Sequence, residues 1–273
     1  MKYAVCNWLF RERTFRKCCE MVARHGFQGL EIAHFTVFDD PRRVSEVTLR
    51  EIRGALEDAG LAFVGFHALL FRPADLHITS ADAGTRARAR EHLRRLIDIA
   101  GALGGGTLVL GSPKQRRAEG IAPERAVEYL REHLVELGPY AAERKSCILV
   151  EALPPADTNV INTLEEARSL IRAVNSTGLG GMFDFHNTKA ERLSWGALID
   201  EYADIIRHVH LNEVDGGLPG AGGSDFGPAF RALAANRYAG WVSLEIFHQP
   251  EDPDGTLAAT RRFLADMEEC IRV

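Results

Sequence analysis

The stretch CILVEALPPAD, residues 147–157, decides the fold of this chain. Its apolar first half ends in a single carboxylate, Glu151. Two prolines then stop further strand pairing, because proline has no backbone N–H to donate to a neighbouring strand. The stretch therefore predicts a short buried strand whose last residue is ionisable and lies just before a turn.

Three later stretches have the same design. GLGGMFDFHN contains Asp184, IIRHVHLNE contains His210, and GWVSLEIFH contains Glu245. From Glu151 onward, the successive ionisable residues are 33, 26 and 35 positions apart, which leaves room each time for one helix and its connections. Four residues of metal-ligand type therefore occur at equivalent points of four successive strand units.

Side-chain alternation places these residues on one side of the predicted sheet. Because neighbouring residues of a strand point to opposite faces, Val242 and Leu244 share one face and Glu245 lies on the other. The strands that contain Glu151 and His210 alternate in the same way. The apolar face suits packing under helices, and the opposite face points into a barrel. All four candidates are predicted to point inward near the carboxyl ends of their strands, where barrel enzymes build their sites.

The whole chain alternates strand-like and helix-like segments. The predicted strands are residues 3–8, 29–35, 61–69, 107–112, 147–153, 179–185, 206–212 and 241–247. The predicted helices lie near residues 14–25, 45–59, 84–103, 123–142, 163–175, 190–203, 226–236 and 256–271. Strict alternation implies parallel strands joined by right-handed crossovers, and eight units predict an α/β fold, a single-domain (βα)8 TIM barrel over residues 1–273. An open doubly wound sheet would usually have a phosphate loop after its first strand, and CNWLFRERTF contains no glycine there.

Composition narrows the class of protein. The 273 residues have a net charge of −5, which argues against a nucleic-acid partner, since such proteins usually present a basic face. No apolar run is long enough to span a bilayer, so we expect no membrane partner. The five cysteines are odd in number and several lie in apolar runs, which predicts reduced thiols and a cytoplasmic location.

The four candidates form a hard, mostly oxygen ligand set of three carboxylates and one neutral imidazole. Such a set favours Mn²⁺, Mg²⁺ or Co²⁺ in octahedral geometry, and suits Zn²⁺ less well. Taken singly, a glutamate that ends a strand is more often a cap or an ion-pair member, and a histidine is more often a hydrogen-bonded core residue. Together they predict one divalent cation, Mn²⁺ first, bound by Glu151, Asp184, His210 and Glu245.

Three earlier residues are further candidates for the site. Glu31 and His67 have the inward parity of the second and third strands. Glu31 is expected to orient a neighbour or bind a hydroxyl, and His67 to hydrogen-bond a sugar oxygen, with a purely structural role as the alternative for each. Trp8, at the end of the first strand, is expected to form an apolar wall for the ligand.

Two loops on the same side of the predicted barrel have two interpretations each. Lys114, Gln115 and Arg116 follow the fourth strand and either form a solvated basic turn or reach an anionic or heavily hydroxylated substrate. The glycine-rich residues 213–225 are either a flexible surface loop or a lid over the mouth.

These motifs resemble a known superfamily. The strand ending in Glu, the strand ending in Asp, the HVHLNE strand and the final GWVSLE are similar to those of the xylose isomerase-like TIM barrels. This is the sugar phosphate isomerase/epimerase group that also contains ketose 3-epimerases, inosose dehydratases and endonuclease IV. The resemblance covers essentially residues 1–273.

The resemblance implies roles for individual residues. By similarity to the ketose epimerases, Glu151 and Glu245 are an acid/base pair as well as metal ligands, and Asp157 stands where those enzymes have a substrate-contacting glutamate. His186 and Asn187 occupy the region where family members commonly place a histidine after the ligand aspartate. Gly216 stands where the ketose epimerases have a substrate-binding arginine.

Three activities are compatible with the family resemblance. The first is a metal-dependent sugar isomerase or epimerase that abstracts a proton next to a carbonyl and passes through an enediolate. The second is a lyase that begins with the same step and then loses water from a keto-inositol or a leaving group from a 3-keto-glycoside. The third, a nuclease similar to endonuclease IV, lacks most of the required histidines. The expected partner is a small sugar or sugar derivative, and analogy with relatives suggests a homo-oligomer.

Overall fold

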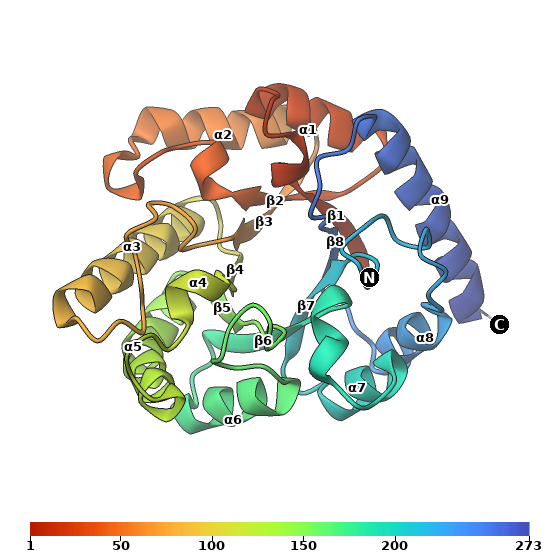
Figure 1. Ribbon diagram of the computed structural model, residues 1–273. Helices are drawn as coiled ribbons and strands as arrows, with labels where there is room; N and C mark the ends of the chain where they lie inside the picture. Colours follow the sequence, from red (N-terminus) through yellow and green to blue (C-terminus); the bar gives the residue numbers. More distant parts are fainter. Residues whose placement is uncertain (273) are drawn as a thin grey trace.

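The computed structural model describes residues 1–272, and within that range eight parallel strands close into a barrel in sequence order (Figure 1). The strands are β1 Lys2–Cys6, β2 Gly29–Ala33, β3 Ala62–His67, β4 Thr107–Leu110, β5 Cys147–Val150, β6 Leu179–Asp184, β7 Ile206–Leu211 and β8 Trp241–Leu244. Strand β8 pairs with β1 and closes the ring. The predicted single-domain (βα)8 barrel is confirmed.

A ring of helices covers the outside of the barrel (Figure 1). The α-helices are α1 Phe15–Arg24, α2 Glu46–Asp58, α3 Ala83–Ala102, α4 Pro113–Arg116, α5 Pro123–Glu143, α6 Leu164–Val174, α7 Trp195–Glu201, α8 Gly227–Ala235 and α9 Pro253–Arg272. The short 3-10 helices are η1 Asn7–Phe10, η2 His34–Thr36, η3 Pro41–Arg43 and η4 His186–Ala190. Five of the α-helices begin at a side-chain cap that accepts the backbone N–H three residues on, namely Thr14, Ser45, Asp82, Thr163 and Ser194.

The strands separate two apolar layers, as their alternation predicts. Ile148 and Val150 of β5 point outward into the main core between the sheet and the helices. Leu149 points inward and forms a small cluster with Val109 and Met182 inside the barrel. The interior is therefore apolar around these residues, and the inward positions that follow Leu149 and Met182 toward the strand ends are the ionisable Glu151 and Asp184.

Strand β3 departs from simple alternation. The pairing of β2 with β3 shifts register between Leu30 and Glu31, where Gly65 has a φ of +155°. A Cβ at Gly65 would lie 1.9 Å from the carbonyl oxygen of Thr107, so no larger residue fits the close approach of β3 to β4. Val64 consequently contacts the interior side of Gly29 instead of lying on the outer face, as simple alternation would place it.

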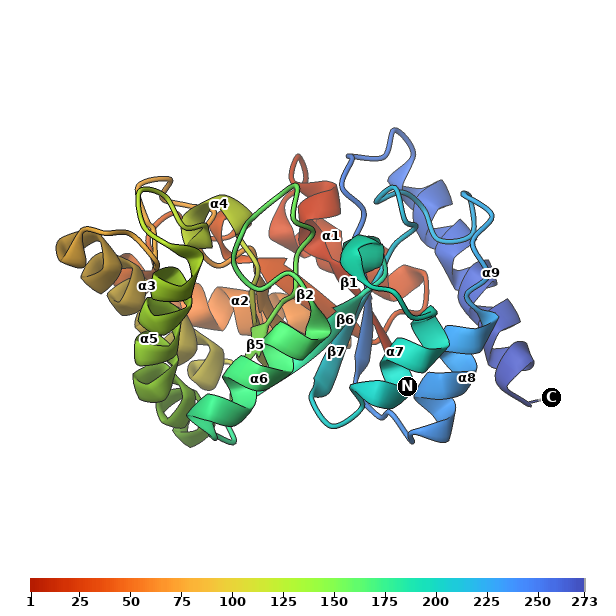
Figure 2. The same ribbon diagram turned by 60° about the horizontal axis from the view of Figure 1, so that its bottom comes forward.

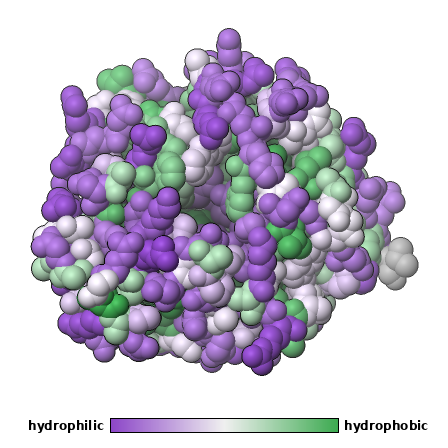
Figure 3. Space-filling view, viewed as in Figure 1, coloured by the Kyte–Doolittle hydropathy of each residue, from purple (hydrophilic) through white to green (hydrophobic). Residues whose placement is uncertain are grey.

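The carboxyl ends of the strands open on one face of the molecule, which carries the long loops (Figure 2). On this face the surface is hollowed near the barrel axis and is rimmed mainly by hydrophilic residues (Figure 3). Glu213 organises the glycine-rich loop after β7, because its carboxylate accepts the backbone N–H groups of Gly220 (3.1 Å) and Gly222 (3.2 Å) and the hydroxyl of Ser224. Among residues 1–272, no helix is long and apolar enough to cross a membrane, and the five cysteines form no disulfide.

Candidate active site and metal centre

The inward ionisable residues lie at the carboxyl ends of their strands. His67 is the last residue of β3 and Asp184 the last of β6, while Glu151 and Glu245 directly follow β5 and β8. The register pairs Asp184 with His210 on the neighbouring strand β7. Because the parallel strands end on the same face, residues distant in sequence meet at the carboxyl end of the barrel interior, which we call the barrel floor.

The four residues predicted as metal ligands come together around the imidazole of His210. Its Nδ1 lies 2.8 Å from Oε2 of Glu245 and 3.6 Å from Oδ2 of Asp184. Potential ligand atoms of Glu151, Asp184 and His210 all lie within 4.8 Å of one another. The convergence expected from the sequence is present in the structure.

Glu31 lies beneath this cluster and orients it. Its carboxylate accepts Nε2–H of His210 at 3.0 Å and Nε2–H of His208 at 2.7 Å. Burial alone would raise the pKa of Glu31, but the two histidines hold it well below its usual range. The side chain of Glu31 is 0% exposed, so its predicted contact with a substrate hydroxyl is wrong and its alternative role, orienting a neighbour, fits the structure.

The donor set passes a test for a divalent cation. With Nε2 of His210 turned to Glu31, Nδ1 faces the carboxylates of Glu245 and Asp184, and among residues 1–272 this buried nitrogen makes no hydrogen bond. In metal sites, a histidine ligand usually donates its other ring N–H to a carboxylate, and that carboxylate fixes the orientation of the ring. Glu151, Asp184 and His210 thus form a possible metal site of the hard type, and Glu245 lies next to it through Nδ1 of His210. We call these four residues together the hard site.

Glu151 and Glu245 lie in different electrostatic surroundings. Burial and the neighbouring Asp184 raise the pKa of Glu151 to about 8, and Nδ2 of Asn187 donates to its Oε1 at 2.9 Å. Burial would also raise the pKa of Glu245, but His210 and His67 hold it well below its usual range. His67 donates from Nδ1 to Oε1 of Glu245 at 3.1 Å. Glu151 therefore holds its proton more tightly than an ordinary glutamate, and Glu245 holds its proton less tightly. Both carboxyls lie at the carboxyl ends of the strands.

A cavity of about 220 Å³ opens above Glu245. We call it the mouth cavity, and its lining includes Cys6, Trp8, His67, Glu245, Phe247 and His248. Trp8 lines this cavity and packs against Phe35 and Phe71 with ring centroids 5.2 and 4.8 Å apart, and its contact with a ligand stays a prediction. His67 lies on the wall with its Nε2 buried and, within residues 1–272, unpartnered.

Other predicted substrate contacts lie away from the mouth cavity. Lys114 is exposed on α4, Gln115 is half-buried beside it, and Asp157 is exposed on the loop after β5. None of the three is among the residues that line the mouth cavity, and their contact with a substrate stays a prediction. The suggested contact of Arg116 is wrong, because its side chain is fully buried and donates to the carbonyls of Leu110 (2.9 Å) and Ile161 (3.3 Å).

His186 and Asn187 lie on opposite sides of the turn η4. Asn187 is buried against Glu151, and its backbone N–H donates to Asp184 Oδ1 at 3.1 Å. The ring of His186 packs edge-on against Phe247, a residue of the mouth cavity, at 4.5 Å between centroids. Asn187 therefore supports the carboxylates of the candidate metal site, His186 lies nearer the rim, and a contact of either residue with a substrate stays a prediction.

Sequence reasoning gave no role at the site to Cys6, His208 or Asn212. His208 donates to Glu31, and the side chain of Asn212 contacts Asp184 and accepts the backbone N–H of His186. Cys6 is buried at the end of β1 beside His67, His210 and Glu245. Strand alternation could have identified all three residues. Cys6 lies two residues before Trp8, and His208 and Asn212 lie two residues before and after His210, so each has the same inward parity as a candidate residue.

Comparison with known proteins identifies the class of protein. The family model of the xylose isomerase-like TIM barrel matches residues 19–267, and the chain belongs to this family. The relatives that the chain matches are named as epimerases and as a dehydratase, so the expectation of an enzyme family is confirmed.

Individual relatives are distant but match the full length of the barrel. The chain is 26% identical over 268 residues to L-ribulose 3-epimerase of a Methylomonas species, covering 93% of this chain and 87% of the relative. The structure of D-psicose 3-epimerase from Clostridium cellulolyticum H10 superposes with a TM-score of 0.86 at 20% identity and covers 99% of both chains. That of E. coli 3-keto-D-glucoside 4-epimerase superposes at 0.83 with 22% identity, covering 99% of this chain and 100% of the other.

Proposed function

We propose that this protein is a divalent-cation-dependent epimerase of a keto sugar, which moves a proton at a carbon next to a carbonyl. The observation that supports this most directly is the pair Glu151 and Glu245, which follow β5 and β8 and lie at a shared floor around His210. Strands five and eight lie well apart in a ring of eight, so the two carboxyls approach the floor from different sides.

Glu245 is suited to abstract the proton. It borders the mouth cavity, its side chain is 19% exposed, and His67 and His210 keep its carboxylate in the ionised form that a base requires. His67 also fixes the orientation of the carboxylate through the hydrogen bond to Oε1.

Glu151 is suited to return a proton from the other side. It is buried against Asp184 and held by Asn187, so its carboxyl retains a proton more readily than an exposed glutamate. A pair of carboxyls with separated proton affinities is the arrangement that acid/base catalysis uses.

Glu151, Asp184, His210 and Glu245 would bind the cation, and we propose Mn²⁺ because three carboxylates and one imidazole suit it. Bound there, a divalent cation would supply Lewis-acid polarisation of the substrate carbonyl. The apolar wall at Trp8 would pack against the face of the sugar ring.

The substrate class follows from the relatives. Ketoses such as ribulose and psicose appear in the names of several, and an oxidised glucoside appears in the name of a structural neighbour. We therefore propose a free ketose or a keto-glycoside as substrate. A homo-oligomeric state and a cytoplasmic location stay predictions.

Solvent isotope exchange tests the proposed reaction. The Mn²⁺-loaded protein, incubated in D₂O with a panel of ketoses and 3-keto-glycosides, should return one of them epimerised and with deuterium at the carbon that changed configuration. Glu245→Gln should lower kcat at least about 10³-fold with the fold intact, because the base is removed.

The exposed Glu132→Gln change on α5 is the matched control, since it makes the same substitution outside the mouth cavity. Release of water or of a leaving group in place of deuterium uptake would assign a lyase instead. Full activity of the Glu245→Gln variant would refute the assignment of the base.

A further inference from the structure

We propose that the barrel floor contains a second cation site, formed by Cys6, His67 and Oε1 of Glu245, which takes a thiophilic divalent ion such as Zn²⁺, Co²⁺ or Cd²⁺. It lies beside the hard site and shares Glu245 with it. The inference rests on the geometry of the strand ends. Because it uses Oε1 of Glu245, a cation bound here would prevent Glu245 from acting as the proposed base, whereas the empty site leaves that oxygen free.

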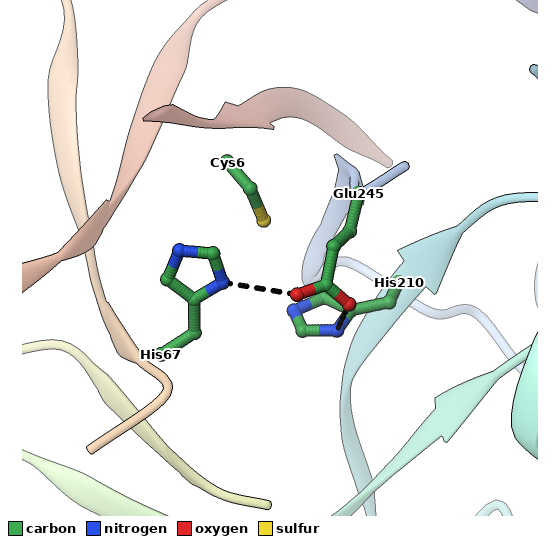
Figure 4. A group of neighbouring side chains, drawn as sticks. All are labelled: Cys6, His67, His210 and Glu245. Atoms are coloured by element: carbon green, nitrogen blue, oxygen red, sulfur yellow. Dashed lines mark hydrogen bonds and ion pairs between the residues drawn. The ribbon is translucent and has the colours of Figure 1, made fainter. Parts of the chain in front are cut away.

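The ligands converge from three different strand ends. Cys6 ends β1, His67 ends β3 and Glu245 follows β8, and Figure 4 shows their side chains directed toward one another and toward His210. One potential ligand atom from each of Cys6, His67, His210 and Glu245 lies within 4.8 Å of all the others. Cys6 and His67 are each 1% exposed, so rotation of exposed side chains is not needed to assemble the group.

Glu245 divides its two oxygens between the two sites. Oε2 lies 2.8 Å from Nδ1 of His210, on the side of Asp184. Oε1 accepts the hydrogen bond from Nδ1 of His67 at 3.1 Å. A carboxylate held in this way can bridge two cations, as carboxylates do in two-metal sites.

The two ligand sets differ in chemical softness. Glu151, Asp184, His210 and Glu245 present mainly oxygen, which Mg²⁺ and Mn²⁺ prefer. Cys6, His67 and Glu245 present one sulfur, one nitrogen and one oxygen, a set that selects Zn²⁺ and its chemical relatives. Three protein ligands leave a fourth position open toward the mouth cavity, which all three of these residues line.

The orientation of His67 identifies its ligand atom. In Figure 4, Nδ1 is the ring nitrogen that faces Oε1 of Glu245, so Nδ1 would bind the cation in place of its proton, while Nε2 lies on the far side of the ring. Cys6 is the thiol nearest to the ligands of the hard site, whereas Cys147 begins β5 at the opposite end of the barrel. A catalytic pair made only of Glu151 and Glu245 gives no role to the thiol of Cys6.

Cobalt titration of the metal-free full-length protein tests the proposal. We expect two Co²⁺ per chain and a near-ultraviolet thiolate-to-cobalt charge-transfer band, but one Mn²⁺ per chain in the parallel titration. Cys6→Ser should bind one Co²⁺ and lose the band. Cys147→Ser, a thiol change at the opposite end of the barrel, should keep both cations and the band.

A wild-type measurement protects the test against a variant that fails to fold. With two equivalents of Zn²⁺, the zinc X-ray absorption spectrum should contain a sulfur neighbour at about 2.3 Å. One Co²⁺ per wild-type chain, a charge-transfer band that persists in Cys6→Ser, or a zinc spectrum without sulfur would each overturn the second site. Epimerase activity can be present or absent in any of these cases, so the two proposals fail separately.

Discussion

At the scale of single residues, Glu31 illustrates how a buried charge orients His210, one of the proposed metal ligands. It has no exposed surface, yet both of its oxygens are used, one by His208 and one by His210. An unpaired buried carboxylate would be costly, and the two imidazoles offset that cost. The arrangement also selects the His210 nitrogen that remains available to a cation.

Replacing Glu31 by glutamine should weaken cation binding. The amide can accept from one histidine but presents an N–H₂ to the other, so the orientation of His210 is no longer enforced. We expect the Mn²⁺ dissociation constant of Glu31→Gln to rise about 10- to 100-fold, measured by calorimetric titration. Asp157→Asn on the exposed loop should bind Mn²⁺ like the wild type, and an unchanged affinity in Glu31→Gln would refute the orienting role.

At the scale of elements, the strand ends carry the candidate ligands, and side chains of the strand ends also hold the loops in place. A side chain holds the glycine-rich loop after β7. The carboxylate of Glu213 accepts the backbone N–H groups of Gly220 and Gly222 and the hydroxyl of Ser224. These hydrogen bonds show that a buried acidic residue two positions after a strand can hold a loop instead of binding a cation. Glu213 and Glu245 both lie close after a strand, but Glu213 holds a loop and Glu245 borders the mouth cavity.

Two buried histidines join η2 and α3 to the loop after β3 through one carbonyl oxygen. His34 of η2 and His92 of α3 both donate from Nε2 to the carbonyl oxygen of Leu69, at 3.2 and 3.0 Å. Burial, followed by the proximity of His92, lowers the pKa of His34 to about 3, and burial also lowers the pKa of His92. Both histidines are therefore neutral in the folded protein near pH 7.

Acid should destabilise the fold through this contact. In the unfolded chain a histidine takes up a proton below about pH 6.5, whereas His34 in the folded chain does so only near pH 3. The contribution of His34 is complete above pH 6.5 and is lost as the pH falls, by about 2 kcal/mol at pH 5. Unfolding in urea at pH 7.5 and pH 5 should show a smaller pH effect in His34→Gln than in the wild type. His248→Gln, at an exposed position, should behave like the wild type, and equal pH effects in all three proteins would contradict the prediction.

At the scale of the whole molecule, the barrel concentrates negative charge at one end of its axis. Glu151, Asp184 and Glu245 face one another across the floor, and Glu31 lies beneath them. Close carboxylates oppose folding through their mutual repulsion, and a bound cation removes this cost. The stability of the fold should therefore depend on the cation.

Chelation should lower the melting temperature. A cation that binds only the folded state at 100 times its dissociation constant adds about 2.7 kcal/mol of stability. For a chain of this size the shift is roughly 5–10 °C, measured as the difference between melting in Mn²⁺ and in EDTA. Glu245→Gln should lose most of the difference and Asp157→Asn should keep it, whereas identical melting with and without Mn²⁺ would argue against the site.

The sequence by itself determined the barrel and the convergence of the four candidate ligands. Eight apolar runs with a period of two, separated by helical segments, permit few other folds, and parity alone turned Glu151, His210 and Glu245 inward. Local turns changed some helix boundaries. The helix predicted near residues 190–203 is the shorter α7, because the turn η4 and the residues after it come first.

Only the tertiary structure decided which neighbours each inward residue meets. Alternation places a side chain on a face, but the stagger of strands around the closed ring sets whether Glu31 contacts a substrate or His210, and whether Arg116 reaches the mouth or the carbonyl of Leu110. The same stagger brings Cys6 of β1 to His67 of β3 and Glu245 of β8. These contacts join strand ends up to 239 positions apart in sequence, and such distances depend on closure of the barrel, which no local pattern encodes.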